Sequence, residues 1–363
     1  MEKKRIVVKI GSSSLTNAKG EIDQVKFQDH ITAIAALRKA GHEVVLVSSG
    51  AVACGFRKLG YSSRPVTLKG KQAAAAVGQS LLVQSYTEQL SKHDIVTAQI
   101  LLTRTDFSSK HRYKNAYSTL SELLDRSVLP IINENDTVSV KELTFGDNDM
   151  LSALVSGLVH ADQLIILTDI NGLYNANPNK DPNAKRIDFL SEVTDEMLSF
   201  ASGAGSKVGT GGMESKILAA KTAYEIGVKV FIGNGKGERK LLQVLEGVGD
   251  GTYIEKDELP VLNNNKQWIS LFSAVAGKLF VDEGAEKALV SQGSSLLPAG
   301  VYKIEGNFRK GDVVEVYGAS GVLGRGEVLY STEELKQSMG KRTDELVVSN
   351  IEVIHRDRWV KHN

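Results

Sequence analysis

Short apolar segments alternate with helical patterns from residue 5 to about residue 257 of this chain. The strand-like segments are nearly continuous in β-branched and other apolar residues: 5–10, 43–48, 94–103, 128–133, 162–168 and 228–232. Helical patterns lie between them: 24–40, 70–91, 114–126, 149–160, 213–226 and 238–246. Because strands that are buried on both faces have continuous apolar sequences, the alternation predicts an α/β fold. Specifically, we expect a three-layer αβα sandwich around a mainly parallel sheet.

The alternation stops near residue 258, where a proline is followed by a cluster of asparagines. This composition is typical of a linker. Beyond it, closely spaced glycines separate short β-branched runs, as expected for a small β-rich barrel or sandwich. We therefore predict an α/β domain at 1–257, a linker at 258–273 and a β-rich domain at 274–363.

Composition excludes several function classes. The 363 residues include 44 Lys and Arg against 43 Asp and Glu, so no broad positive field attracts nucleic acid or an acidic membrane. The single cysteine, Cys54, excludes an intramolecular disulfide and suits a reducing compartment. No apolar run has the length of a membrane span, and the chain starts with a strand-like segment rather than a signal peptide. We expect a cytoplasmic protein with no membrane partner.

Two lysines lie at turns of the kind that bind anions. Lys216 follows the string GTGGMES at 209–215, which enters a helical pattern. The N–H groups and dipole at such a helix start attract phosphate. Lys9 interrupts an apolar run that ends at a glycine and three serines, 11–14. The alternatives are a surface turn for the first string and, for the second, a sheet-edge lysine that reaches water. Neither string fits the Walker pattern, and G-x-G-x-x-G does not occur.

Residues 133–149 form an acidic loop with five carboxylates and three amides: Glu134, Asp136, Glu142, Asp147, Asp149, Asn133, Asn135 and Asn148. A solvated loop is the plain alternative, and Asp147 also fits a helix cap. The clustering otherwise predicts a site for an ammonium group, for Mg²⁺, or for carboxylates that orient lysines.

These strings together match the needs of phosphoryl transfer: cations and N–H donors for the moving phosphate, a metal on the nucleotide, and an aligned acceptor. Lys9, Lys216 and their glycine turns meet the first two needs. The acidic loop suits the ammonium of an amino acid, and 48–51 offers N–H and hydroxyl donors to its carboxylate. Neither a Ser–His–Asp arrangement nor a metal-binding histidine spacing is evident.

In chain order, the strings at 8–11, 47–51, 167–169 and 209–216 resemble the amino acid kinase family. The strings at 132–136 and 146–149 are similar to its glutamate 5-kinase branch. The tail resembles a PUA domain. The sequence departs only slightly from the family pattern. Ser215 stands where the family often has threonine, and Ser13 and Ser14 of the 11–14 turn differ from the residues often found there.

The resemblance implies transfer of phosphate from ATP, with Mg²⁺, to the side-chain carboxylate of L-glutamate, which is the first step of proline biosynthesis. It implies catalytic roles for Lys9, Lys216 and Asp149, and glutamate binding by Ser49, Asp136 and Asn148. It also implies an ATP site, formed by Lys9, Thr168, Asp169, Thr210, Gly211, Gly212, Met213 and Lys216. No residue is assigned as a metal ligand.

Feedback inhibition by proline and a homo-oligomer are further expectations from the resemblance. Two alternatives remain. One is a related kinase for N-acetylglutamate, aspartate or a nucleotide, although the acidic loop favours a free α-ammonium. The other is an RNA-binding protein that uses its PUA domain. Residues 274–363 carry 12 Lys and Arg against 13 Asp and Glu, so RNA is not the expected partner.

Overall fold

The computed structural model describes residues 2–17, 19, 21–138, 148–176, 181–194, 197, 212–255, 264–319, 321–341 and 351–362. The chain divides into two compact units. One consists of Met1–Asp106 with Lys114–Val261, and the other of Phe107–Tyr113 with Leu262–Asn363. In the described residues, no helix combines the length and the apolar character needed to span a bilayer.

The first unit is built on a sheet in which eight strands are described, in the order β3-β4-β2-β1-β5-β9-β10-β8. Their bounds are β1 (Arg5–Ile10), β2 (Glu43–Ser48), β3 (Thr97–Leu102), β4 (Leu129–Glu134), β5 (Gln163–Leu167), β8 (Phe189–Leu190), β9 (Lys229–Gly233) and β10 (Gly251–Ile254). The pairs from β3 to β9 are parallel, and β10 runs antiparallel to β9. The mainly parallel sheet predicted from the apolar runs is confirmed.

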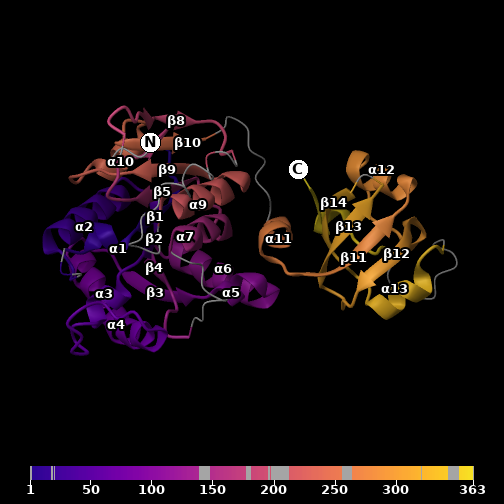
Figure 1. Cartoon of the computed structure of the whole chain (residues 1–363), viewed down its shortest axis with the longest axis horizontal. Helices are drawn as coiled ribbons and strands as arrows, with labels where there is room; N and C mark the ends of the chain where they lie inside the picture. Colours follow the sequence, from indigo (N-terminus) through magenta and orange to yellow (C-terminus); the bar gives the residue numbers. More distant parts are fainter. Residues whose placement is uncertain are drawn as a thin grey trace. The chain divides into compact units, whose positions relative to one another are not determined.

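Helices cover both faces of this sheet, as Figure 1 shows for α2 and α10 on one side and α7 and α9 on the other. The bounds in this part of the chain are α1 (Ser12–Leu15), α2 (Gln24–Lys39), α3 (Ala51–Gly55), α4 (Leu68–Ser91), α5 (Arg104–Ser108), α6 (Lys110–Asp125), α7 (Asn148–Leu158), α9 (Met213–Glu225) and α10 (Lys240–Leu245). The three-layer αβα sandwich is therefore confirmed.

The two-residue period of β1 sorts its side chains between the two helical layers. Ile6, Val8 and Ile10 lie in the large core formed with α2, α4 and α10. Val7 and Lys9 alternate with them and face the opposite layer, where α7 packs against β1. Lys9, in the interior of a central strand, therefore projects into the helical layer that contains α7, the helix that begins at Asn148.

Several short elements are not evident in the apolar pattern. They include α1, α3, α5, β10 and a small hairpin of β6 (Leu173–Tyr174) and β7 (Arg186–Ile187). The helix α3 is too short to show a helical period. Its N-cap is Gly50, whose φ of 116° lets the chain turn sharply after β2. Gly55 and Gly78 then let α3 and α4 touch through their backbones, because a Cβ on Gly78 would lie 1.8 Å from the Ala51 oxygen.

The second unit contains a five-stranded sheet in the order β12-β11-β13-β14-β15. Its elements are α11 (Asn264–Gln267), a π-helical turn (Trp268–Phe272), β11 (Val275–Val281), α12 (Glu283–Ser291), β12 (Val301–Gly306), β13 (Val313–Gly318), β14 (Gly321–Glu327), α13 (Thr332–Ser338) and β15 (Trp359–Lys361). This β-rich domain confirms the predicted class of the tail.

Phe107–Tyr113 belongs to the compact second unit. The rings of Phe107 and Tyr113 lie 5.4 and 5.3 Å from that of Phe272, and Trp268 Nε1 donates to the Phe107 carbonyl at 3.1 Å. Lys110 pairs with the buried Glu327 at 2.5 Å. The boundary at 257 and the linker at 258–273 stay predictions.

Candidate active site

Parallel strands present their carboxyl ends at one edge of the sheet, where ligands of open α/β folds bind. Four adjacent strands of the first unit, β4, β2, β1 and β5, end here in polar sequences. The chain passes from β1 into Gly11 and α1, and from β2 into Ser49 and Gly50. The side chains singled out in the sequence therefore approach one another at this edge.

Asp149 forms ion pairs with two lysines that come from opposite ends of the first unit's sequence. Its Oδ1 contacts the Lys9 ammonium, and its Oδ2 lies 3.0 Å from Lys216 Nζ. The Asp149 side chain is 0% exposed, and the two lysines are 5% and 9% exposed. The Ser215 hydroxyl lies 3.3 Å from the same Oδ2. Two cations are thus held beside one carboxylate, with a net positive charge.

Local structure explains how these three residues meet. Asp149 lies in the first turn of α7, and Lys216 in the first turn of α9, whose N-cap is Gly212. Helices α7 and α9 pack against each other on the face of the sheet to which Lys9 points. A Cβ on Gly11 would lie 3.3 Å from the Lys9 ammonium, so the glycine after β1 leaves space beside it.

The pKa of Asp149 reflects two opposing effects. Burial alone would raise it, but the charges and hydrogen bonds of Lys9 and Lys216 hold the pKa below its ordinary value. The carboxylate therefore stays ionised at neutral pH, with its charge directed at the two ammonium groups.

Asn148, next to Asp149, belongs to a buried amide network. Its Nδ2 donates to Ser49 Oγ at 2.9 Å, to Asn133 Oδ1 at 2.7 Å and to the Ser48 carbonyl at 3.2 Å. Asn133 Nδ2 in turn donates to Gln79 Oε1 at 2.8 Å. Residues from four elements or their ends are thereby fixed together, and two of them, Ser49 and Asn148, are expected glutamate ligands.

Asp136 follows β4 and is half-buried. Burial raises its pKa above the ordinary value, while the charge of Arg64 acts in the opposite direction. Two further carboxylates of this loop, Glu142 and Asp147, lie outside the described residues.

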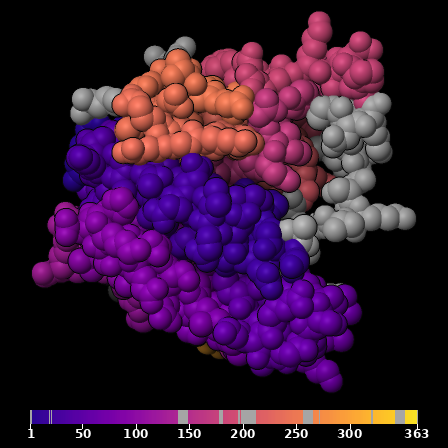
Figure 2. Space-filling view, turned by 90° about the vertical axis from the view of Figure 1, so that its left-hand side faces the viewer, coloured from indigo at the N-terminus to yellow at the C-terminus, as the bar shows by residue number. Residues whose placement is uncertain are grey.

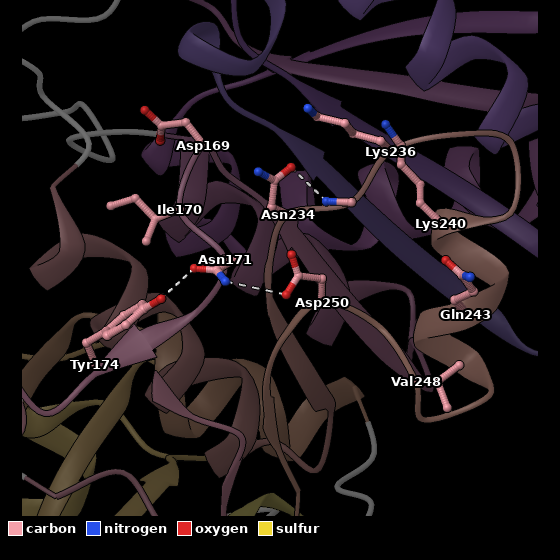
Figure 3. Close-up of a pocket in the computed structure, with 11 residues that line it drawn as sticks. Asp169, Ile170, Asn171, Tyr174, Asn234, Lys236, Lys240, Gln243, Val248 and Asp250 are labelled. Atoms are coloured by element: carbon pink, nitrogen blue, oxygen red, sulfur yellow. Dashed lines mark hydrogen bonds between the residues drawn. The ribbon is translucent and has the colours of Figure 1, made fainter. Parts of the chain in front are cut away.

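Thr168 and Asp169 follow β5, and the Thr168 hydroxyl donates to Asp169 Oδ1 at 3.0 Å. Asp169 is also at the rim of a pocket of about 700 Å³, lined from the β5–β6 segment, the β9–α10 segment and α10 (Figure 3). Within it, Tyr174 OH donates to Asn171 Oδ1 at 2.7 Å. The polar lining and the volume suit a nucleoside-sized ligand.

A cluster of polar and charged side chains that includes Lys240 forms part of one wall of this pocket. Lys240 of α10 pairs with Asp29 at 2.6 Å, and its Nζ lies 2.9 Å from Nδ1 of His30. His30 Nε2 contacts the carbonyl oxygen of Ser14 at 3.1 Å. Figure 2 shows the two segments side by side, with the orange surface near residue 250 against the indigo N-terminal part. The cluster thus connects the pocket wall to the turn after β1.

The structure brings together most of the residues singled out in the sequence. Lys9, Lys216 and Asp149 form one cluster and Ser49 and Asn148 another, while Gly212 and Met213 start α9. Thr210 and Gly211 lie outside the described residues.

Three further polar residues at this edge were not singled out: Gln79, His30 and Lys240. The helical spacing of buried positions could have indicated Gln79, because it shares the buried face of α4 with Leu82 and Tyr86. The other two meet across 210 residues of sequence, so no local pattern indicates them.

The described residues contain no group of three or more His, Cys, Asp and Glu side chains suited to hold a metal. The oxygens of Asp149 are already engaged by lysines.

The profile described as "Amino acid kinase family" matches residues 4–234, which is more than half of the chain. The chain belongs to the amino acid kinase family. A second profile, for the PUA domain, matches residues 277–348.

Curated relatives match nearly the whole chain. It is 64% identical over 361 residues to glutamate 5-kinase 1 of Bacillus licheniformis and 62% identical to glutamate 5-kinase 1 of Bacillus subtilis, with 99% of each chain covered. Glutamate 5-kinase of Bacillus cereus (strain ATCC 10987) is 59% identical over 365 residues, covering 99% of this chain and 100% of the relative. The match of this amino acid kinase thus extends over nearly the whole length of each of these relatives.

Proposed function

We propose that this kinase transfers the γ-phosphoryl group of ATP to the side-chain carboxylate of L-glutamate, forming γ-glutamyl phosphate in the first step of proline biosynthesis. The observation that carries the proposal is the buried pair of lysines on Asp149, directly beside the amide network of Asn148. Full-length relatives that are named glutamate 5-kinase support it.

The reaction brings two anions together, so its main requirement is positive charge that is fixed in place. Lys9 and Lys216 provide that charge, and Asp149 holds both ammonium groups in position. A carboxylate oxygen of glutamate attacks the γ-phosphorus as the bond to the β-phosphate oxygen breaks, and ADP leaves. No proton has to move, because the acceptor is already ionised at neutral pH.

Ser49, Asp136 and Asn148 form the proposed acceptor site. The Asp136 carboxylate suits the α-ammonium of a free amino acid. An N-acetylated substrate lacks that charge and would leave Asp136 without a partner. This difference favours L-glutamate over N-acetylglutamate.

The proposed ATP site extends from the pocket beside Asp169 to the start of α9. The nucleoside would occupy the pocket, with Thr168 and Asp169 at its rim, and the phosphates would approach Lys9, Lys216 and the turns that precede α1 and α9. This assignment includes Gly212 and Met213, together with Thr210 and Gly211. Mg²⁺ bound to ATP would neutralise phosphate charge as it develops.

We further propose that proline inhibits the enzyme at or near the glutamate site, that the chain forms a homo-oligomer, and that it acts in the cytoplasm. The proposed domains are the kinase at 1–257 and the PUA domain at 274–363, joined by a linker at 258–273. RNA is not a proposed partner, because the PUA segment has no excess of basic residues.

The test is an acceptor panel. With MgATP, the purified protein should release ADP when L-glutamate is added, and hydroxylamine should trap the acyl phosphate as a hydroxamate. Aspartate and N-acetylglutamate serve as matched acceptors, one shorter by a methylene group and the other without the ammonium. Faster turnover of either one than of L-glutamate would contradict the proposed acceptor.

A further inference from the structure

Gln79 lies at the point where α4 meets the ends of β2 and β4. It is 8% exposed and shares the buried face of α4 with Leu82 and Tyr86. Its neighbour Gly78 packs against the backbone of Ala51 at the start of α3. A long polar side chain is therefore buried next to the turn that contains Ser49.

The hydrogen bonds fix which end of the Gln79 amide faces Asn133. The Glu134 backbone N–H donates to Asn133 Oδ1 at 2.9 Å, so that oxygen is an acceptor. The Asn133 Nδ2 group must then be the donor toward Gln79 at 2.8 Å. A flipped Gln79 would oppose two NH₂ groups, so its Oε1 faces Asn133 and its Nε2 is the remaining donor.

That remaining donor is unsatisfied. Gln79 Nε2 is buried, and it makes no hydrogen bond within the described residues. Buried amide groups in native proteins nearly always have partners, and an orphaned one requires a specific explanation.

The neighbouring Asn148 cannot act as the donor to a ligand carboxylate. Its Nδ2 is already directed at the Ser48 carbonyl, Ser49 Oγ and Asn133 Oδ1. Its remaining oxygen is an acceptor, which suits an ammonium group instead. Gln79 Nε2 therefore adds a buried donor to the N–H and hydroxyl groups that residues 48–51 offer to a carboxylate.

We propose that Gln79 Nε2 donates a hydrogen bond to the α-carboxylate of bound L-glutamate, which makes Gln79 a substrate-specificity residue. The inference rests on the proposed function. The γ-carboxylate has to face Lys9 and Lys216 for phosphoryl transfer, which leaves the α-carboxylate for the buried amide.

Gln79→Glu tests the contact without changing the size of the side chain. It keeps the acceptor that Asn133 uses but replaces the donor with a carboxylate oxygen, which repels the α-carboxylate. The glutamate KM should rise about tenfold or more, as expected when a buried hydrogen bond is lost and a like charge is added. The KM for ATP should stay near the wild-type value, and calorimetry should show the same loss in glutamate binding.

L-Isoglutamine, in which the α-carboxylate is a neutral amide and the γ-carboxylate is intact, gives the decisive comparison. Gln79→Glu should shift the kcat/KM ratio toward L-isoglutamine over L-glutamate by about tenfold, because the new carboxylate accepts from the substrate amide. Gln79→Met is the matched variant without donor or acceptor, and it should lose more activity with glutamate than with isoglutamine.

A role confined to holding Asn133 predicts a different order. Gln79→Glu would then resemble wild type, Gln79→Met would be the impaired variant, and the substrate ratio would not move, which would overturn the inference. If the wild-type protein does not phosphorylate L-glutamate, the proposed function itself fails.

Discussion

Asp149 illustrates, at the scale of single residues, how the fold keeps two cations in a buried site. Burying either lysine without a counter-charge would be strongly unfavourable. One ionised carboxylate satisfies both, and each of its oxygens faces one ammonium group. The cluster keeps a net positive charge, which a phosphoryl group with its negative oxygens can use.

His30 supports a pH prediction at the same scale. Burial and the charge of Lys240 lower its pKa from 6.5 to about 4, so the ring is neutral in the folded protein. The unfolded chain binds a proton more readily between these pH values, so the free energy of unfolding falls as the pH drops from about 6.5 toward 4.

Between pH 7 and pH 5 this histidine should reduce the free energy of unfolding by about 2 kcal/mol. Urea unfolding at both pH values measures the change, with His30→Gln as the control because glutamine does not titrate. An equal loss of stability in wild type and variant would rule out the buried neutral histidine.

The contact between α3 and α4 gives a prediction at the scale of elements. A Cβ on Gly78 would lie 1.8 Å from the Ala51 oxygen, so Gly78→Ala must push the two helices apart. Overpacking of this kind typically costs about 1–3 kcal/mol of stability. Because α3 begins just after Ser49, the glutamate KM should also rise.

Ala76→Ser, on the exposed face of the same helix, is the control and should have little effect. Urea unfolding and steady-state kinetics measure both consequences. A Gly78→Ala protein with wild-type stability and glutamate KM would contradict the close packing of these helices.

Most strands of the parallel sheet were predictable because they lie in nearly continuous apolar runs. Lys9 was detectable as a charge that interrupts such a run, and Lys216 by its glycine turn. By contrast, α3 is too short to show a period. The Lys240–His30 contact and the orphaned Gln79 amide depend on tertiary packing between distant segments. Sequence therefore indicated the charged groups of the site, and the structure was needed for the hydrogen bonds that orient them.

At the scale of the whole molecule, all proposed substrate-binding and catalytic residues lie before residue 257. A chain that ends near Lys256 should therefore keep glutamate kinase activity, with kcat/KM within about threefold of the full chain because distant groups contribute independently. It should also remain inhibitable by proline. Kinetics of the shortened and full chains, with and without proline, measure both.

The shortened chain lacks Phe272, the aromatic partner of Phe107 and Tyr113. We expect a lower melting temperature as a result, because the apolar rings of Phe107 and Tyr113 become exposed to solvent. A folded but inactive shortened chain would show that the tail completes the site. An active one that no longer responds to proline would assign regulation to the tail.

The central claim is that the paired lysines stabilise the transferring phosphoryl group while Asn148 serves the acceptor. Glutamate-dependent steady-state kinetics at saturating MgATP test it most directly, on Lys216→Ala and Asn148→Ala side by side. Lys216→Ala should lower kcat by about 10²–10³, or roughly 3–4 kcal/mol, and leave the glutamate KM little changed. Asn148→Ala should mainly raise the glutamate KM. Equal, modest changes in both parameters for both variants would contradict this division of roles.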